Sequence, residues 1–417
     1  MPSGVALAGF LAGAVVSLLT SFVLVSRLER VGERLGLSEA LLGMVAALAA
    51  DAPEISAAVT AVSHHEQRVG AGVIIGSNVF NLAALLGLGA VVAGRIGLHR
   101  KVVALGGAVA LAVAAVCLGV VFGVLATPAG LALGLAILVL YLMILGHEWL
   151  APVLPRRWVG WLRSAVAEEE SELEDAIKPR RGRWQDAVVA AGALLVVVAA
   201  SAVMERSATA LGARFAVPGI VVGGLVLAAV TSMPNAVAAV YLAIHGRGAA
   251  TLSTALNSNT LNVVAGLLVP AVVLGLGRPS SQAELITIWY AGLLAAVLAF
   301  AYRDRGLRRA VGAFVIAAYA AFSVSMLASG GHRGHWAPLI TALGVATALS
   351  AAAGLMAPWL ARGRRAGRDR LARDGSAREG DRISSRRCRE GRSGAPCSPG
   401  LACPCWSPRP GPPSDPD

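Results

Sequence analysis

Charged residues are scarce in this chain. They make up 14% of its 417 residues, whereas hydrophobic residues make up 56%. A soluble globular protein has roughly 25% charged residues, so we expect a membrane protein that crosses the bilayer several times. Cysteine is scarce as well. Cys117 lies in the apolar part of the chain and the other cysteines lie after Arg362, so cysteine says nothing about the core.

Three further features of the sequence argue against other classes of protein. No Lys or Arg precedes the first apolar run, residues 5–25. Signal peptides have a basic start and a shorter apolar region, so we interpret this run as a retained span. The net charge of +12 comes from arginines in loops and in the tail, and this placement argues against nucleic-acid binding. No motif pairs a nucleophile with a base, so an intramembrane enzyme has little support.

Eleven apolar runs are long enough to cross a membrane, which takes about 20 mostly apolar residues. Helices are the expected form, because a spanning segment must satisfy its own backbone hydrogen bonds. The runs are also too long and too uniformly apolar for barrel strands. They cover residues 5–25, 40–62, 69–93, 102–126, 128–150, 185–204, 216–244, 250–276, 283–302, 308–328 and 336–360. The sequence therefore predicts an all-α polytopic membrane protein.

The loops between these runs differ in charge. Odd-numbered loops hold 18 basic residues and even-numbered loops hold 5. Cytoplasmic loops of membrane proteins are the basic ones, so we expect the N-terminus outside and the C-terminal tail in the cytoplasm. A composition rich in Ala, Val and Arg is typical of a GC-rich bacterium, which would make this membrane the plasma (inner) membrane.

One stretch of the sequence occurs twice. Residues 47–81 read ALAADAPEISAAVTAVSHHEQRVGAGVIIGSNVFN, and residues 228–262 read AAVTSMPNAVAAVYLAIHGRGAATLSTALNSNTLN. The prolines, Pro53 and Pro234, are separated by 181 residues, and the S-N-x-x-N boxes keep the same offset without a gap. A shared register for a proline and a polar box indicates an internal duplication.

The two copies are expected to be inverted. Five runs precede the loop at 151–184 and five follow it before the last run at 336–360, and the copies occupy about 40–93 and 216–276. Their offset covers an odd number of spans, which gives them opposite orientations, as in secondary transporters. The predicted organisation is an inverted 5+5 transmembrane-helix repeat plus an eleventh C-terminal helix. Its parts are a first half at 1–150, a cytoplasmic loop at 151–184, a second half at 185–328, an extra helix at 336–360 and a disordered basic tail at 362–417.

Oxygen-bearing side chains surround the two prolines. Asp51 and Glu54 are i,i+3 neighbours that can share a helix face, and acids inside a membrane span are functional by default. Each proline removes a helix hydrogen bond and frees backbone carbonyls, so we interpret Pro53 and Pro234 as helix breaks. We predict that Asp51 and Glu54 bind a metal cation. The other candidate ligands are Ser77, Asn78, Asn81, Thr231, Ser232, Asn235, Ser258, Asn259 and Asn262.

This donor set favours a hard cation. Ca²⁺ takes six to eight oxygen ligands from carboxylates, carbonyls and amides. No thiolate or imidazole accompanies the two acids, which argues against zinc or copper.

The repeats resemble the calcium/cation antiporter superfamily, the sodium/calcium exchangers with two inverted alpha-repeats. The family pattern is roughly G-T-S-x-P-E on one helix and G-S-N-x-x-N on the next. ADAPE with GSNVFN resembles the first repeat, and TSMPN with NSNTLN resembles the second. The resemblance implies an antiporter, not an enzyme, that exchanges Ca²⁺ or a related cation for Na⁺ or H⁺ by alternating access. It implies no resident cofactor.

The resemblance also assigns roles to residues. Glu54 corresponds to a principal cation ligand of the family. The lesser ligands correspond to Ser77, Asn81, Thr231, Ser232, Ser258 and Asn262.

The chain departs from the family pattern at two positions. Asn235 stands where the second repeat has a glutamate, and Asp51 stands where a serine is usual. Both acids therefore lie on one helix, where they repel each other when close, and one of them can hold a proton. Two alternatives remain open: a proton-coupled or monovalent-cation exchanger, and a degenerate, non-transporting membrane scaffold. The expected partners are inorganic cations and the lipid bilayer.

Overall fold

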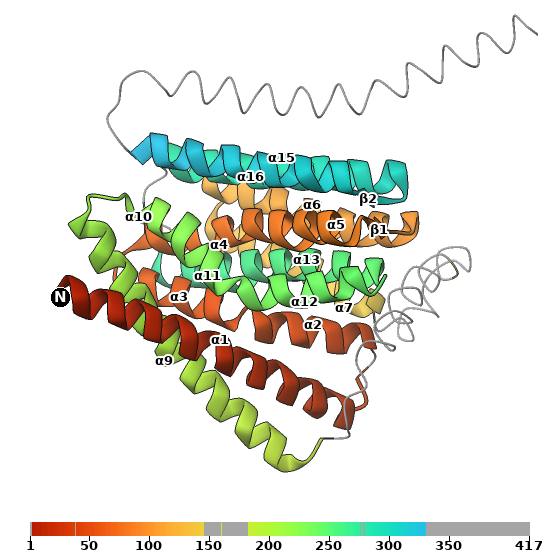
Figure 1. The fold of residues 1–417 in the computed structure, drawn as a ribbon, viewed down its shortest axis with the longest axis horizontal. Coiled ribbons are helices and arrows are strands. Elements are labelled where there is room, and N and C mark those ends of the chain that lie inside the picture. The colour runs from red at the N-terminus through yellow and green to blue at the C-terminus, as the bar shows by residue number, and fades with distance from the viewer. Residues whose placement is uncertain are drawn as a thin grey trace, which may run out of the picture. The chain divides into compact units, whose positions relative to one another are not determined.

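The computed structural model describes residues 2–37, 39–145, 160, 182–275, 277 and 280–330. Across these residues the chain forms long helices joined by short loops, with one two-stranded sheet (Figure 1). The predicted eleventh span, the tail and most of the loop at 151–184 lie outside the described residues.

The first half of the chain begins with helix α1 and a bent pair, α2 and α3. A long helix follows whose middle segment, η1, is π-helical. The bounds are α1 (Ser3–Arg34), α2 (Glu39–Ala50), α3 (Ala52–Ser63), α4 (Gln67–Asn81), η1 (Leu82–Leu88), α5 (Gly89–Ala93), β1 (Arg95–Gly97), α6 (Arg100–Val121) and α7 (Thr127–Leu145).

The second half follows the same plan. Its bounds are α9 (Trp184–Arg214), α10 (Gly219–Val221), η3 (Val222–Leu227), α11 (Ala228–Thr231), α12 (Met233–Ile244), α13 (Gly248–Leu261), η4 (Asn262–Leu268), α14 (Val269–Leu274), α15 (Ser281–Asp304), β2 (Gly306–Arg308) and α16 (Arg309–Gly330). Helices α9 and α1 pack side by side, and both continue past the apolar runs that predicted them.

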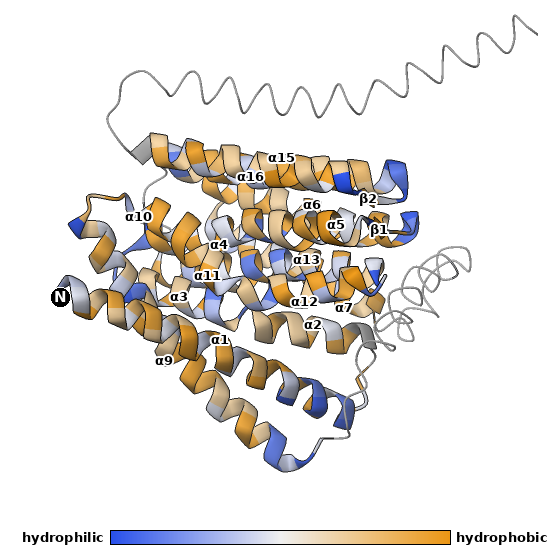
Figure 2. Cartoon of the chain, in the orientation of Figure 1, coloured by the Kyte–Doolittle hydropathy of each residue, from blue (hydrophilic) through white to orange (hydrophobic). Residues whose placement is uncertain are grey.

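These helices lie at the first ten apolar runs of the sequence. In the described part of the chain, eight helices are long and apolar enough to cross a membrane. Two bent pairs bring the total to as many as ten. Most of each outer helix is coloured as hydrophobic, whereas hydrophilic segments appear at the helix ends and inside the bundle around α3, α4 and α13 (Figure 2). This distribution is the one expected of a bundle whose surroundings are lipid.

The two bent pairs are structural copies. Helices α2 and α3 meet at 48°, and the α10–α11 segment meets α12 at 49°. The bends lie at Asp51 and Ser232, and each following helix carries its proline in the first turn. Proline is favoured at that position, since the first helical N–H groups have no partner. The pairs run in opposite directions (Figure 1), as the inverted repeat requires.

Glycine permits a close helix contact between α4 and the α10–η3 segment. A β-carbon on Gly76 would lie 2.4 Å from the carbonyl oxygen of Gly224 and 2.5 Å from its Cα. One turn earlier, a β-carbon on Gly72 would lie 2.7 Å from the carbonyl oxygen of Ile220. Backbone therefore meets backbone along this seam, and no side chain fits between the two segments.

The sheet joins the two halves at one end of the bundle. Strands β1 and β2 pair antiparallel, with Arg95 opposite Arg308 and Gly97 opposite Gly306. Gly306 has φ +144°, and a β-carbon there would lie 2.2 Å from the carbonyl oxygen of Ile96, so only glycine fits. The sequence analysis did not predict this pairing, which adds a short sheet to an otherwise helical fold.

Candidate cation site

The two bends bring the first turns of α3 and α12 into the interior of the bundle. Asp51 and Ser232 occupy equivalent places before each helix and have nearly the same backbone angles (φ −80°, ψ −8° and −2°). Helix α3 packs against η4, and α12 packs against η1, so each of these helices contacts the π-helical segment of the other copy. Glu54 lies in the first turn of α3, where the helix dipole favours negative charge.

Glu54 is held by residues from the second copy. Its side chain is fully buried. Its Oε1 accepts a hydrogen bond from Ser232 Oγ at 2.5 Å, and its Oε2 accepts one from Asn262 Nδ2. Ser77, also buried, lies beside the same carboxylate. Both repeats therefore contribute to the surroundings of this one acid.

Asp51 is fully buried and is likewise held by the second copy. Its Oδ1 accepts hydrogen bonds from Asn235 Nδ2 and from Ser258 Oγ, both at 2.6 Å. Asn235 is the residue that stands where the resemblance calls for a glutamate. The structure gives this departure a physical reason: the amide donates to a carboxylate that stands where a serine is usual.

Asparagines connect the two acids. Asn78 and Asn259 are equivalent in the repeats, and each donates from Nδ2 to the backbone carbonyl of the other at 3.2 Å. Asn81 donates to Ser258 Oγ at 3.0 Å and to Asn259 Oδ1 at 3.1 Å. Asn262, besides bonding Glu54, donates to Asn78 Oδ1 at 3.3 Å. The internal duplication thus appears as an approximately two-fold symmetric hydrogen-bond network.

Four buried oxygens of this network have no hydrogen-bond partner. They are Asp51 Oδ2, Ser77 Oγ, Asn81 Oδ1 and Asn262 Oδ1. Buried acceptors are normally paired, and buried carboxylates normally have a cationic partner. In the described part of the chain no Arg, Lys or His pairs with Asp51 or Glu54. The arrangement is suited to a small cation that binds oxygen.

The donor set differs from that of a permanent metal centre. Among the described residues, no group of three or more His, Cys, Asp and Glu side chains is placed to hold a metal ion. Any cation at this site would have two carboxylates and several neutral oxygens as ligands. A ligand set with only two charged groups suits a cation that binds and is then released.

Thr231 is the predicted ligand that the structure sets apart. Its Oγ1 donates to the carbonyl of Leu227 at 2.9 Å, within its own helix. The other predicted ligands lie in or against the network, from Asp51, Glu54, Ser77, Asn78 and Asn81 in one copy to Ser232, Asn235, Ser258, Asn259 and Asn262 in the other.

Tyr290 and Glu205 are among the buried polar residues that the sequence analysis missed. Tyr290 on α15 is fully buried, and its hydroxyl faces Asn78. A tyrosine near Thr287 in the middle of an apolar run was the available signal. Glu205 on α9 is 1% exposed and accepts a hydrogen bond from Thr209 at 2.9 Å. The charge pattern placed Glu205 at the end of a span, and only the packing of α9 against α1 and α3 buries it.

Comparisons with known proteins agree with this architecture. The family model described as sodium/calcium exchanger protein matches residues 5–150 and 186–328. CaxA of Alkalimonas amylolytica, named as a proposed antiporter, is 33% identical over 82 residues. That match covers 19% of this chain and 26% of the relative, about a quarter of its length.

Two solved structures share the fold. The crystal structure of the H⁺/Ca²⁺ exchanger CAX has a TM-score of 0.62 at 14% identity, covering 87% of this chain and 91% of the other. The sodium-calcium exchanger NCX_Mj has a TM-score of 0.50 at 18% identity, covering 78% of this chain and 99% of the other. The family match covers more than half of the chain and both copies of the repeat. The chain is thus a multi-pass membrane protein that belongs to the sodium/calcium exchanger protein family, a family of secondary transporters.

Proposed function

We propose that this protein is a cation antiporter that exchanges Ca²⁺ for Na⁺ or H⁺ at the Asp51–Glu54 site. One observation carries the proposal. Two buried carboxylates from one repeat are bonded by donors from the other, and no cationic side chain among the described residues balances them. The family description and the relatives named as exchangers support Ca²⁺ as the cargo.

The charge of the site explains why exchange is its natural chemistry. Two carboxylates hold two negative charges, which one divalent cation or two monovalent ions neutralise equally well. An empty, doubly charged site is costly in a low-dielectric interior. One ion therefore leaves most readily when another replaces it.

Alternating access follows from the origin of the ligands. Ser232 and Asn262 of the second copy hold Glu54 of the first. Any movement of one copy against the other changes the coordination at Glu54. Ion occupancy is thereby linked to the relative position of the two repeats, as in other inverted-repeat transporters.

A second candidate is a proton-coupled or monovalent-cation exchanger without Ca²⁺ transport. The amide of Asn235 favours it, since it supplies a donor where a carboxylate would add a third charge. A site with fewer charges binds divalent cations less tightly.

The test is ⁴⁵Ca²⁺ uptake into proteoliposomes, first under an imposed Na⁺ gradient and then under an imposed pH gradient. We expect uptake to follow one gradient and to be lost in Glu54→Gln and Asp51→Asn. Glu284→Gln, a matched change at the start of α15, should leave uptake intact. Full uptake by Glu54→Gln would sink the proposal. A monovalent-cation flux that requires Glu54, without Ca²⁺ uptake, would establish the second candidate. No flux of any ion would favour the non-transporting membrane scaffold.

We also infer that the N-terminus lies outside the plasma membrane, on the strength of the 18-to-5 division of basic residues between alternate loops. A protease-sensitive tag at the N-terminus should be cut in intact cells. A tag that is cut only after lysis would reverse the orientation.

A further inference from the structure

Five exposed arginines gather at the end of the bundle that carries the sheet. They come from both halves of the chain, at the α5–β1–α6 and the α15–β2–α16 junctions. We call them the sheet-end arginines: Arg95, Arg100, Arg305, Arg308 and Arg309. Strand pairing sets Arg95 opposite Arg308, so segments far apart in the sequence concentrate positive charge in one place.

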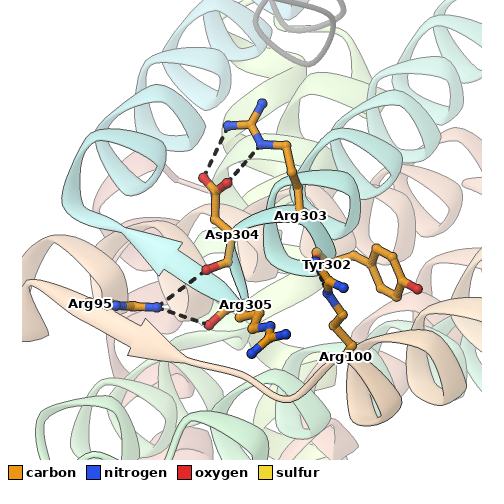
Figure 3. A network of polar contacts seen from close by, with 6 residues as sticks. All are labelled: Arg95, Arg100, Tyr302, Arg303, Asp304 and Arg305. Atoms are coloured by element: carbon orange, nitrogen blue, oxygen red, sulfur yellow. Dashed lines mark hydrogen bonds and ion pairs between the residues drawn. The ribbon is translucent and has the colours of Figure 1, made fainter. Parts of the chain in front are cut away.

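Several of these side chains are fixed in place. Arg95 Nη2 donates to the carbonyls of Asp304 and Arg305 at 3.4 and 3.5 Å, and Arg100 Nε donates to the carbonyl of Tyr302 at 3.2 Å (Figure 3). The guanidinium of Arg100 also lies 5.4 Å from the centre of the Tyr302 ring. Arg309 Nε donates to the carbonyl of Val91 at 3.0 Å. Each of these bonds uses part of a guanidinium and leaves other N–H groups for an external acceptor.

The local sequence supplies almost no balancing charge. Asp304 is the sole acid within residues 95–101 and 302–309. Its carboxylate is engaged by the neighbouring Arg303, at 2.8 and 3.2 Å (Figure 3). The like charges of the sheet-end arginines repel one another, and that repulsion is relieved when an anion binds between them.

The position of the cluster at the end of apolar helices indicates that the anion is a lipid phosphate. Helices α5 and α15 are apolar up to this point, and Val92 and Tyr302 are about half exposed (51% and 48%). Tyrosine at the end of an apolar helix marks the level of the lipid headgroups. Guanidinium groups bind phosphate with two parallel hydrogen bonds.

We propose that the sheet-end arginines bind the phosphate of an anionic phospholipid. The lipid bridges β1 and β2 and so ties the first half of the chain to the second at this end. This site is separate from the carboxylates and does not depend on which ion is transported.

The test is a thermal unfolding titration of the purified full-length protein in detergent with phosphatidylglycerol. Phosphatidylcholine and inorganic phosphate at equal phosphate concentration are the comparison ligands. We expect phosphatidylglycerol alone to raise Tm. The double variant Arg305→Gln/Arg308→Gln should need roughly thirtyfold more of it for half the effect. Arg68→Gln/Arg214→Gln, which removes two exposed arginines outside the cluster, should behave like the wild type.

Three results would overturn the proposal: an equal effect of phosphatidylcholine, an equal effect of inorganic phosphate, or an unchanged titration in the double variant. The second would show a free-anion site instead. If the glutamine variant unfolds, Arg305→Lys/Arg308→Lys takes its place. This variant keeps the positive charges but loses bidentate hydrogen bonding to phosphate. Phosphatidylglycerol should therefore still raise its Tm, with weaker affinity. An unchanged affinity in that variant would also contradict the proposal.

Discussion

At the scale of single residues, the pairing of Asp51 with Asn235 determines the character of the site. The sequence located both residues but could not show that they touch, because the contact joins positions 184 apart. The sequence alone showed Asn235 as a candidate ligand that lacks the carboxylate expected at this position. In the structure it is a hydrogen-bond donor to one of the two carboxylates that remain. The residue types were therefore predictable and their pairing was not.

Replacing Asn235 with aspartate tests this pairing. Asn235→Asp places a second carboxylate about where the amide bonds Asp51, without a donor between them. We expect Ca²⁺ uptake at neutral pH to fall on the order of tenfold or more, because an uncompensated buried charge costs several kcal/mol. Activity should partly return in Asp51→Asn/Asn235→Asp, which restores one acid and one amide. A double variant no better than Asn235→Asp would argue against a functional pair.

Removing the hydroxyl of Ser232 tests the bond to Glu54. Ser232→Ala leaves Oε1 of Glu54 without its 2.5 Å donor. Hydrogen bonds to charged groups contribute about 1.5–3 kcal/mol, so we expect a tenfold or larger change in the Ca²⁺ concentration for half-maximal uptake. Ser325→Ala, a buried serine that bonds only its own helix at Phe322, is the matched control. Equal behaviour of the two variants would show that Ser232 has no part in ion binding.

At the scale of helices, apolar runs and prolines allowed much of the fold to be predicted. Each bend lies two residues before its proline, and the constant offset predicted that the two bends would be equivalent. The π-helical segments were not predicted, because their sequences LAALLGL, VGGLVL and NVVAGLL resemble ordinary helix. Nor was the β1–β2 pairing, since each strand has three residues and its partner lies in the other half of the chain.

The seam between α4 and η3 predicts a strong effect of one methyl group. Gly76→Ala forces its β-carbon against the backbone of Gly224, and backbone cannot move aside as a side chain can. We expect a loss of about 1–3 kcal/mol of stability, seen as a lower Tm. Gly192→Ala on α9, with open space around it, should leave Tm unchanged or raise it. A Tm for Gly76→Ala equal to that of the wild type would show that α4 and η3 can move apart at little cost in stability.

At the scale of the whole molecule, the two copies of the repeat are equal in layout and unequal in detail. The position equivalent to Gly76 is Asn257, a residue with a side chain. Helix α13 therefore cannot approach its counterpart α2 as α4 approaches η3. Hydropathy and the constant sequence offset showed that the two copies exist. Only the structure shows which helix contact is made by backbone against backbone.

Ligand binding should stabilise the molecule as a unit, because a site built from both halves exists only in the folded state. By mass action, Ca²⁺ at 100 times its Kd adds about 2.7 kcal/mol. We expect Tm to rise with added Ca²⁺ and to return when a chelator removes it. Glu54→Gln should lose this response, and Glu284→Gln should keep it. A Ca²⁺ response that survives in Glu54→Gln would place the bound ion elsewhere.

The bare seam between α4 and η3 has an electrical consequence. Where Gly76 meets Gly224 there is no room for a file of water, so the contact insulates. A membrane voltage falls across insulating layers and hardly at all across hydrated ones. Moving one elementary charge through the whole drop takes about 2.3 kcal/mol per 100 mV. We therefore expect an ion that passes this seam to cross more of the membrane voltage than an ion that moves through a hydrated region.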